Sequence, residues 1–264
     1  MTTTGGSEIP SFMSKYCNPN KRTQWEMLFS DLDRGNSMTN IMNELDKWVS
    51  LRGTGNYIPA DYTSEHVKFG LHESFGIQQE RSEIKEFVSF LTGLENRGSC
   101  LEIGLGYYGS THFIWRHLYD RVLTVEYQRD RMFQFRNNMT DFYGKHVLDD
   151  GKSSFFFGYS NETHVISKVK KDIEENTASP KLDMLFIDGD HEYISVLTDW
   201  MIYKHFVKPG GLIAFHDSVS TVQGAGVRVF LEELRSGKID GKSYNIEQIV
   251  SSKECGIAYY FVEE

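Results

Sequence analysis

Short apolar runs alternate with longer segments of helical periodicity from Gln79 to the end of the chain. The short runs predict strands at Ser99–Ile103, Arg121–Glu126, Ser154–Phe157, Leu182–Asp188 and Gly211–His216. The longer segments predict helices at Glu83–Leu94, from Ser110 onward, and at Arg129–Gly144, Glu162–Glu174 and Glu192–Val207. Short apolar strands separated by helices are typical of βαβ units, whose parallel strands are covered by helices on both faces. Because such crossovers are right-handed, the pattern predicts a doubly wound α/β fold.

The last part of the chain departs from this alternation. A predicted helix at Val227–Arg235 is followed by two strand-like runs, Tyr244–Val250 and Gly256–Val262, with only a short link around Ser252–Cys255. Parallel strands require a crossover of about a dozen residues or more, so a link this short predicts an antiparallel pair. The expected sheet therefore has seven strands, is mostly parallel and carries an antiparallel C-terminal hairpin.

Residues 1–78 differ in pattern from residues 79–264, and we treat them as a separate segment. Turn-forming clusters such as Gly53–Asn56 interrupt this segment. Two helices are predicted between the clusters, at Gln24–Leu32 and Met38–Leu51. The predicted organisation is a helical N-terminal segment followed by one α/β domain.

The composition limits the classes of function. The 264 residues include 28 Lys and Arg against 37 Asp and Glu, which gives a formal net charge of −9. This acidity argues against nucleic acid as the main partner, because phosphate binding requires a basic surface. Hydrophobic residues make up 39% of the chain and aromatic residues 14%, too many for a disordered protein.

The sequence also bears on compartment. No apolar run approaches the ~18 residues of a membrane helix, so we expect no membrane association. Residues 1–20 contain no apolar segment of the kind found in secretory signals. Cys17, Cys100 and Cys255 are widely spaced and form no C-x-x-C pair, which predicts reduced thiols rather than disulfides or a zinc site. Together these features predict a cytoplasmic globular protein.

A glycine-rich loop supplies the first candidate for chemistry. Gly104–Gly109 has the pattern G-x-G-x-x-G, directly after a predicted strand and before a predicted helix. Glycines at such a place let a nucleotide-bearing ligand approach the backbone at a helix N-terminus, although an ordinary tight turn has the same pattern. Glu126 ends the next strand, twenty residues after Gly106. A carboxylate there can hold both hydroxyls of a ribose.

Two kinds of ligand suit this loop. A dinucleotide would place its pyrophosphate on the glycines, whereas S-adenosylmethionine (AdoMet) has no phosphate and carries a sulfonium and an ammonium group. Glu102 lies two residues before the first glycine and favours AdoMet, because a carboxylate repels a pyrophosphate and attracts an ammonium group. The alternative is a strand-end Glu satisfied by backbone N–H groups.

Four motifs together resemble class I AdoMet-dependent methyltransferases. They are Leu101–Gly104 with its glycine loop, Glu126, Phe186–Tyr193, and Lys208–Leu212 before Phe215–Asp217. The region of resemblance also includes Gly226–Arg228 at the start of the last predicted helix. The branch that they resemble contains small-molecule O-methyltransferases, including antibiotic-sugar and catechol-type enzymes. The resemblance covers residues 79–264 and implies a Rossmann-like methyltransferase fold. It also implies methyl transfer from AdoMet to a hydroxyl oxygen of a small molecule, with residues 1–78 as a lid over the acceptor. Families of this type often form homodimers.

The resemblance assigns roles to particular residues. The methionine half of the cofactor would be surrounded by Glu102, Gly104, Gly106 and Ser110, and its ribose would be bound by Glu126. Asp188 would contribute a further hydrogen bond to the cofactor. The family usually binds adenine with a Gly-Asp pair after the third strand. This chain has Gly158-Tyr159-Ser160 there, so Ser160 is the candidate hydrogen-bond partner.

A pair of acids is a candidate metal site. Asp188 ends the fourth predicted strand and Asp217 follows the fifth, so both should reach the same crevice of a doubly wound sheet. Two carboxylates suit Mg²⁺, which would hold vicinal oxygens of the acceptor. Related metal-dependent enzymes have a third ligand beside the fifth-strand acid, where this chain offers His216 or Ser218. In the alternative, Asp217 caps the following turn and Asp188 only binds cofactor.

His191 is the candidate general base. It lies three residues after Asp188, where catechol-type enzymes place a lysine near the acceptor oxygen. An imidazole can take a hydroxyl proton near neutral pH as the methyl group is transferred. In the alternative, His191 caps the helix that starts at Glu192.

Two other functions share part of this pattern. The glycine loop and Glu126 also permit an NAD(P)-dependent oxidoreductase, which Glu102 and the antiparallel hairpin oppose. A protein that keeps the fold only for binding is the other alternative. The intact glycines and acids oppose it.

Overall fold

The computed structural model describes residues 81–94, 97–106, 109–133, 135, 150–221, 225–250 and 255–263. The expected N-terminal segment, with its helices at 24–32 and 38–51, lies outside these residues. The helices are α4 (Arg81–Thr92), α5 (Ser110–Leu118), α8 (Thr163–Asn176), α9 (Tyr193–Tyr203) and α10 (Ala225–Arg235), with a 3-10 turn η2 (Lys204–Phe206) after α9. The strands are β1 (Ser99–Ile103), β2 (Arg121–Glu126), β3 (Ser153–Phe157), β4 (Leu182–Ile187), β5 (Val207–Phe215), β6 (Glu247–Ile249) and β7 (Ile257–Phe261).

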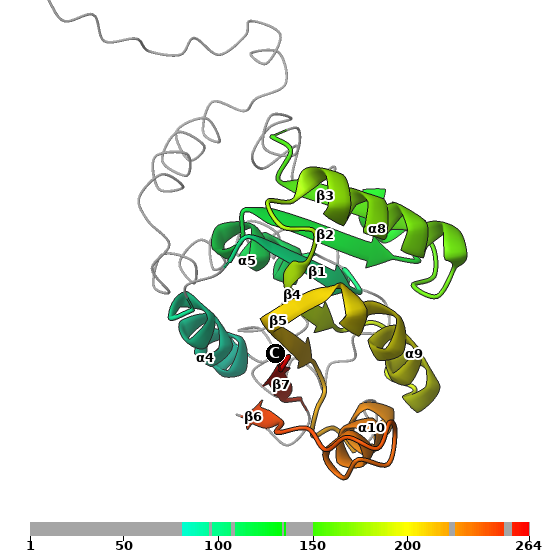
Figure 1. The fold of residues 1–264 in the computed structure, drawn as a ribbon. Helices are drawn as coiled ribbons and strands as arrows, with labels where there is room; N and C mark the ends of the chain where they lie inside the picture. Colours follow the sequence, from blue (N-terminus) through cyan, green and yellow to red (C-terminus); the bar gives the residue numbers. More distant parts are fainter. Residues whose placement is uncertain are drawn as a thin grey trace, which may run out of the picture. The chain divides into compact units, whose positions relative to one another are not determined.

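The seven strands form one sheet in the order β3-β2-β1-β4-β5-β7-β6 (Figure 1). Strands β1 to β5 pair in parallel, whereas β7 is antiparallel to both of its neighbours, β5 and β6. The doubly wound sheet and its antiparallel C-terminal hairpin are therefore confirmed. The strand order reverses between β1 and β4, and such a switch point opens a crevice beyond the carboxyl ends of the strands.

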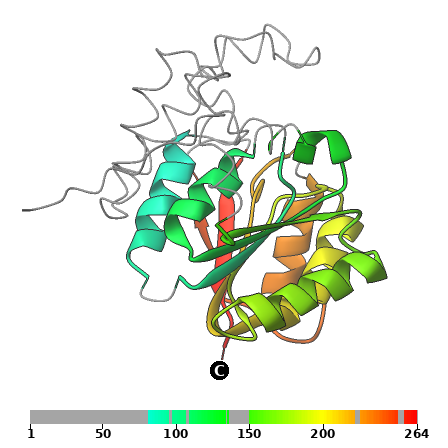
Figure 2. The same ribbon diagram turned by 90° about the horizontal axis from the view of Figure 1, so that it is seen from above.

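Helices cover both faces of the sheet. Figure 2 shows α4 and α5 on one face and α8, α9 and α10 on the other. Side chains alternate along each strand, so Leu101 and Ile103 of β1 belong to the core on the α8–α10 face, whereas Glu102 contacts Trp115 of α5. Trp115 also packs edge-on against Phe87 of α4. No described helix is both long and apolar enough to cross a bilayer.

The sequence pattern placed some boundaries wrongly. Strand β5 begins at Val207, four residues before the prediction, because Val207 pairs with Leu182 across an irregularity in the β4–β5 register. The preceding helix ends at Tyr203, since Lys204–Phe206 forms the 3-10 turn. Strand β6 contains only Glu247–Ile249 of the predicted Tyr244–Val250. Of the helix predicted at 129–144, the structure describes residues 129–133 and 135, all helical.

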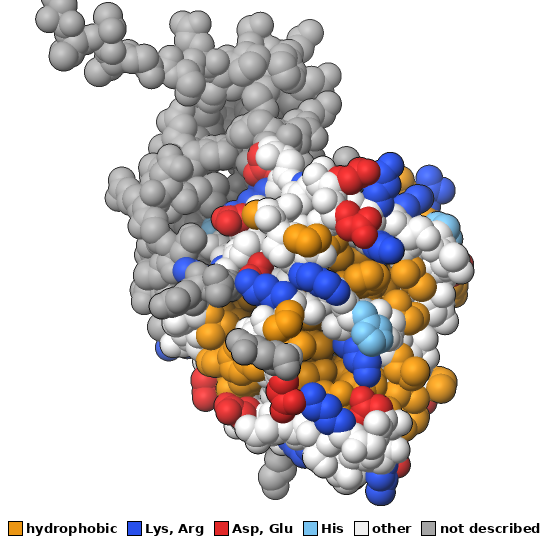
Figure 3. Space-filling model, in the orientation of Figure 1, with side chains coloured by type: hydrophobic (Ala, Val, Ile, Leu, Met, Phe, Trp, Pro, Cys, Tyr) orange, Lys and Arg blue, Asp and Glu red, His pale blue; other side chains and the backbone are white. Residues whose placement is uncertain are grey.

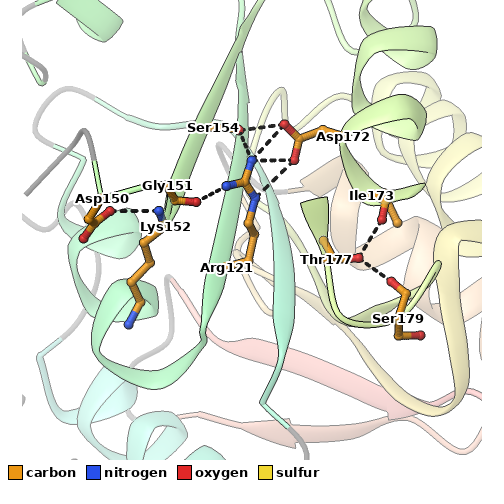
Figure 4. Close-up of polar contacts among 9 residues, drawn as sticks. All are labelled: Arg121, Asp150, Gly151, Lys152, Ser154, Asp172, Ile173, Thr177 and Ser179. Atoms are coloured by element: carbon orange, nitrogen blue, oxygen red, sulfur yellow. Dashed lines mark hydrogen bonds and ion pairs between the residues drawn. The ribbon is translucent and has the colours of Figure 1, made fainter. Parts of the chain in front are cut away.

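One arginine joins three elements at the end of the sheet opposite the crevice (Figure 4). Arg121, the first residue of β2, donates through Nε and Nη2 to the Asp172 carboxylate of α8, at 2.8–3.2 Å. It also donates to the Gly151 carbonyl and, at 2.6 Å, to Ser154 Oγ of β3. Ser154 in turn donates to Asp172 at 2.8 Å. The guanidinium therefore fixes α8 against the β2–β3 edge.

We predict that Asp172→Asn lowers the free energy of unfolding by about 2 kcal/mol and the melting temperature by roughly 5 °C. The Arg121 and Asp172 side chains are each 14% exposed, so the variant leaves a largely buried cation without its anion. Glu174 lies on the same helix, is 54% exposed and pairs with Lys170 at 3.8 Å. Glu174→Gln is the matched control and should change stability little. Equal melting temperatures for both variants in thermal unfolding would contradict the structural role of Arg121.

Candidate functional site

The carboxyl ends of neighbouring strands bring the predicted acids to one edge of the sheet. Glu102 lies within β1, Glu126 ends β2, and Asp188 follows β4 directly. Asp217 follows β5 after one intervening residue. The glycine loop between β1 and α5 lies beside these acids.

The glycine loop needs glycine for reasons internal to the fold. Gly104 has φ 94° and donates its N–H to the Val125 carbonyl at 2.9 Å. A Cβ on Gly104 would lie 2.0 Å from the Asp188 carbonyl oxygen, so this glycine lets β1 and the end of β4 approach each other. Gly106 and Gly109 also have positive φ, 67° and 64°. The loop thus runs directly beside Asp188. Tyr107, Tyr108 and the side chain of Ser110 lie outside the described residues.

Glu126 faces the same loop. Its side chain is buried, with 2% of the residue exposed. One carboxylate oxygen accepts the Leu105 N–H at 3.0 Å, and the other accepts the Gln128 N–H at 2.7 Å. Each carboxylate oxygen can accept more than one hydrogen bond, so capacity remains for a ligand. The structure brings the predicted ribose-binding acid and the glycine loop together.

Glu102 points into the protein core. Its oxygens accept hydrogen bonds from Trp115 Nε1 at 3.1 Å and from Thr124 Oγ1 at 2.9 Å. Burial raises its pKa to about 8, against an ordinary value of 4.5. The carboxyl group is thus largely protonated at neutral pH, and it contributes less negative charge than the sequence argument assumed. The alternative predicted from the sequence gave Glu102 backbone N–H partners, but the structure gives it side-chain donors. Contact between Glu102 and a ligand stays a prediction.

The end of β3 carries exposed aromatic rings. Tyr159 is 60% exposed and stacks on Tyr127, with ring centroids 5.3 Å apart and an interplanar angle of 16°. Ser160 turns away from them, because its hydroxyl donates to Asp199 of α9 at 2.5 Å. Burial raises the pKa of Asp199 to about 6. A hydrogen bond from Ser160 to an adenine stays a prediction, and the two tyrosine rings supply a flat surface beside it.

Asp188 and Asp217 meet two histidines at the ends of β4 and β5. His216 Nδ1 lies 3.2 Å from Asp188 Oδ1 and 3.1 Å from Asp217 Oδ2. His191 Nε2 lies 3.1 Å from the same Asp217 oxygen and 3.9 Å from Asp188 Oδ1. The expected convergence of the two acids is therefore present in the structure, and the candidate base lies beside them.

His191 does not cap α9. Asp190 makes the hydrogen bonds at the start of that helix. Its carboxylate accepts hydrogen bonds from Ser195 Oγ at 2.6 Å and from the Glu192 N–H at 3.4 Å. Gly226 packs against this turn, since a Cβ there would lie 2.4 Å from the His191 carbonyl oxygen. The His191 ring instead faces Asp217 and is 33% exposed. The capping alternative is therefore not supported.

Glu83 is a functional candidate that the sequence analysis missed. It lies in the first turn of α4, is fully buried, and faces His216 Nε2 at 3.5 Å. Burial raises its pKa, and the His216 ring opposes this rise. A signal was present in the sequence, because Glu83 precedes the buried Phe87 by four residues and so shares its helix face.

His216 carries a positive charge between these acids. Burial disfavours the charged ring, but Asp188 and Asp217 outweigh it and hold the pKa of His216 well above its ordinary value. Burial likewise opposes the ionisation of Asp217, yet His216 and His191 lower its pKa. The imidazolium thus compensates carboxylates that are largely removed from water.

The described donors do not fit the expected Mg²⁺ site. Mg²⁺ demands near-octahedral oxygen ligands, but His216 Nδ1 already approaches one oxygen of each of Asp188 and Asp217. Donor atoms of Asp188, His191 and Asp217 all lie within 4.8 Å of one another, yet an imidazole ligand is more typical of transition metals.

Ser218, the expected third ligand, is committed to the hairpin. Its N–H donates to the Gly256 carbonyl at 3.0 Å, and a Cβ on Gly256 would lie 2.6 Å from Ser218 Oγ. The hydroxyl therefore faces the segment that leads into β7. That hydroxyl is buried and makes no hydrogen bond with the described residues, so Ser218 as a third ligand stays a prediction.

Residues 101–218, slightly less than half of the chain, match a family model described as a methyltransferase domain. A short stretch of 36 residues is 50% identical to uncharacterized protein R132 of Acanthamoeba polyphaga mimivirus. That match spans 14% of this chain and only 16% of the relative.

Solved structures share the fold. The O-methyltransferase TomG from Streptomyces achromogenes, crystallised with S-adenosylmethionine, has a TM-score of 0.52 and 17% identity, covering 84% of this chain and 99% of TomG. Cofactor-bound Rv0187 from MTB has a TM-score of 0.50 and 19% identity, covering 78% of this chain and 93% of that protein. At these identities the similarity concerns the fold alone.

The buried Glu102 predicts a characteristic pH dependence of stability. Its pKa of about 8 lies above the ordinary 4.5, so the folded state holds a proton that the unfolded state releases. The corresponding stability is complete below pH 4.5 and is lost as the pH rises through about 8. Glu102→Gln mimics the protonated form. Relative to wild type, it should therefore gain on the order of a few kcal/mol between pH 5 and pH 8.

Urea unfolding at several pH values measures this difference. Glu175→Gln is the control, since Glu175 is 58% exposed on α8. Its unfolding free energy should follow that of wild type at every pH. Parallel curves for Glu102→Gln and wild type would show that the buried carboxyl does not bind its proton as the structure implies.

Proposed function

Residues 101–218 form a methyltransferase domain, and from this premise we propose that the protein transfers a methyl group from AdoMet to a hydroxyl oxygen of a small molecule. One arrangement carries the proposal. The glycine loop lies between Glu126 on one side and the Asp188, Asp217 and His191 cluster on the other. A donor and an acceptor can therefore be held next to each other at the switch point of the sheet.

The residues around the loop fit AdoMet. The loop has positive φ at each glycine and leaves Glu126 beside it, so a ribose can be bound by a carboxylate at the end of β2. The stacked rings of Tyr127 and Tyr159 follow the ends of β2 and β3 and offer an aromatic face to adenine. When bound, AdoMet supplies a methyl group on a positively charged sulfur. The Asp188 and Asp217 carboxylates favour that charge over the pyrophosphate of a dinucleotide.

His191 is the group that we propose removes the acceptor proton. Its Nε2 faces Asp217, which leaves Nδ1 to accept a proton from a hydroxyl group. A carboxylate behind an imidazole fixes the orientation of the ring and stabilises its charged form. The ring is partly exposed, so an acceptor can reach it from the crevice. Proton removal in this scheme requires no metal.

The acceptor that we propose is a small molecule of the cytoplasm. The buried, unoxidised thiol of Cys100 suits a reducing compartment. On the face shown in Figure 3, basic and acidic side chains are interspersed among hydrophobic ones. The net charge of −9 supports a small-molecule acceptor over nucleic acid, whose binding calls for a continuous basic surface.

We predict that AdoMet and S-adenosylhomocysteine bind to the full-length protein with micromolar affinity in calorimetry, whereas NAD does not bind measurably. Glu126→Gln should weaken AdoMet binding by roughly tenfold, because a charged hydrogen-bond acceptor for the ribose is lost. Glu232→Gln, on α10 with a side chain that is 56% exposed, is the control and should bind as wild type. Tight NAD binding without AdoMet binding would replace the proposal with a dehydrogenase.

We further predict that His191→Ala lowers turnover at least ~10²-fold while the affinity for AdoMet stays within a factor of about two. The reason is that the variant removes the proton acceptor but leaves the glycine loop and Glu126 intact. Turnover is measured as methyl transfer to a panel of catechols and sugar diols. The matched control is His164→Ala on α8, whose side chain is 57% exposed.

Two outcomes would contradict this scheme. Rapid turnover by His191→Ala would remove His191 from proton transfer. A loss of wild-type activity in EDTA that Mg²⁺ restores would show that a metal, rather than the imidazole alone, activates the acceptor.

A further inference from the structure

Glu83 and His216 form a buried pair behind the proposed site. Glu83 comes from α4, which contributes no other residue to the strand-end cluster among those described, and His216 comes from the end of β5. Glu83 is 0% exposed and His216 is 4% exposed. Glu83 Oε1 faces His216 Nε2 at 3.5 Å, and the His216 ring and the Gly256 backbone both lower the pKa of Glu83. Burying a charged group costs free energy unless a partner compensates it. The burial of both Glu83 and His216 therefore needs a structural or functional reason.

The alternation of β5 sends His216 toward α4. Leu212, Ala214 and His216 lie on one face of the strand, and Ile213 and Phe215 belong to the core on the other face. The His216 N–H also donates to the Ile187 carbonyl at 3.1 Å, which fixes the backbone of β5 against the end of β4. The ring therefore occupies a defined position between α4 and the strand ends.

The two ring nitrogens of His216 face different partners. Nε2 faces Glu83, whereas Nδ1 faces Asp188 at 3.2 Å and Asp217 at 3.1 Å. The contact to Asp217 is a hydrogen bond between buried side chains. A single ring thus contacts one carboxylate behind the site and two within it.

The backbone conformation of Asp217 has to be stabilised by contacts such as the one with His216. Asp217 is the only non-glycine residue with positive φ among those described, at 56°, a conformation that costs free energy unless its surroundings hold it. The backbone after it is fixed by the Ser218 N–H, which donates to the Gly256 carbonyl at 3.0 Å. The carboxylate is fixed by His216 and in turn faces His191 at 3.1 Å. A continuous series of contacts therefore runs from Glu83 through His216 and Asp217 to His191.

We propose that Glu83 and His216 are positioning residues, which hold the Asp188 and Asp217 carboxylates together and, through Asp217, orient the His191 ring toward the acceptor. The inference rests on the proposed methyl transfer. Glu83 anchors the far side of the His216 ring, so the ring cannot turn away from the two acids. Neither residue touches the reacting atoms.

The different partners of the two ring nitrogens allow a sharp test. The amide nitrogen of Asn can take the place of Nδ1, and that of Gln can take the place of Nε2. His216→Asn therefore keeps a donor for Asp188 and Asp217, whereas His216→Gln keeps only one for Glu83. Both variants lose the positive charge of the ring, so the difference between them reports the hydrogen bonds to the two acids. We expect His216→Gln to lower kcat by ~10²-fold and His216→Asn by no more than ~10-fold, with KM for the acceptor changed less than kcat. Glu83→Gln, which keeps an acceptor but loses the charge, should lower kcat several-fold.

The controls separate positioning from packing. His205→Gln and Glu86→Gln alter exposed residues of η2 and α4 and should leave kcat unchanged. Pyrocatechol, or whichever member of the acceptor panel is turned over fastest, serves as the probe. If His216 only filled space, the larger Gln would be tolerated better than Asn, and this reversed order would overturn the proposal. Equal, wild-type kcat for both variants would overturn it as well.

A second measurement does not depend on turnover. Crystals of wild type, His216→Asn and His216→Gln grown with S-adenosylhomocysteine report the positions of both carboxylates directly. We expect the facing oxygens of Asp188 and Asp217 to stay within 4.8 Å in wild type and in the Asn variant, and to separate in the Gln variant. Unmoved carboxylates in the Gln variant would refute the positioning role. If wild type neither binds AdoMet nor methylates any acceptor, the proposed function fails, whereas the carboxylate positions still test the pair.

Discussion

A carboxylate that leaves water must be neutralised, paired with a cation or given strong hydrogen bonds, and this constraint organises the carboxyl edge of the sheet. The protein meets it in three ways. Glu126 accepts two backbone N–H groups and remains next to the glycine loop. Glu102 is buried with a pKa of about 8 and so loses most of its charge at neutral pH. Asp188 and Asp217 keep their place in the crevice through the His216 ring, which also faces Glu83. The carboxyl edge of the sheet therefore carries several acids beside the glycine loop, as the proposed cationic donor requires.

The sequence predicted the central strands almost to the residue. Apolar residues predominate in Ser99–Ile103 and Arg121–Glu126. The first run is followed by Gly104 and the second ends at Glu126, so the apolar pattern and the residues that end it agree. The boundaries of β5 and β6 were predicted less accurately. Strand β5 extends back through Pro209 and Gly210, residues of low strand propensity, because β4 and the chain near Val262 supply pairing partners there. Strand β6 is shorter than its apolar pattern, since only Glu247–Ile249 has a neighbour to pair with. Pairing in three dimensions decided both boundaries.

The site was predicted in part. The positions of Asp188, Asp217 and His191 follow from the rule that parallel strands present their carboxyl ends at one edge. The bonding among them does not follow, because it depends on which ring faces which carboxylate. Ser218 was expected as a possible third metal ligand, and its buried hydroxyl beside Gly256 leaves that role a prediction. Glu83 could have been found from its place on the buried face of α4, but its partner His216 lies 133 residues away, since 216 − 83 = 133. No local pattern reports a contact of that range.

The assignment of the glycine loop, Glu126 and Asp188 to a methyl-donor site is tested most directly by a crystal structure of the full-length protein with sinefungin. Sinefungin carries an amine in place of the methylsulfonium group of AdoMet. We expect its density along the glycine loop, with both ribose hydroxyls within hydrogen-bonding distance of Glu126, adenine against Tyr127 or Tyr159, and the amine facing Asp188. Density elsewhere on the protein, or a crevice closed by its own side chains at saturating sinefungin, would contradict the assignment of this edge of the sheet as a methyl-donor site.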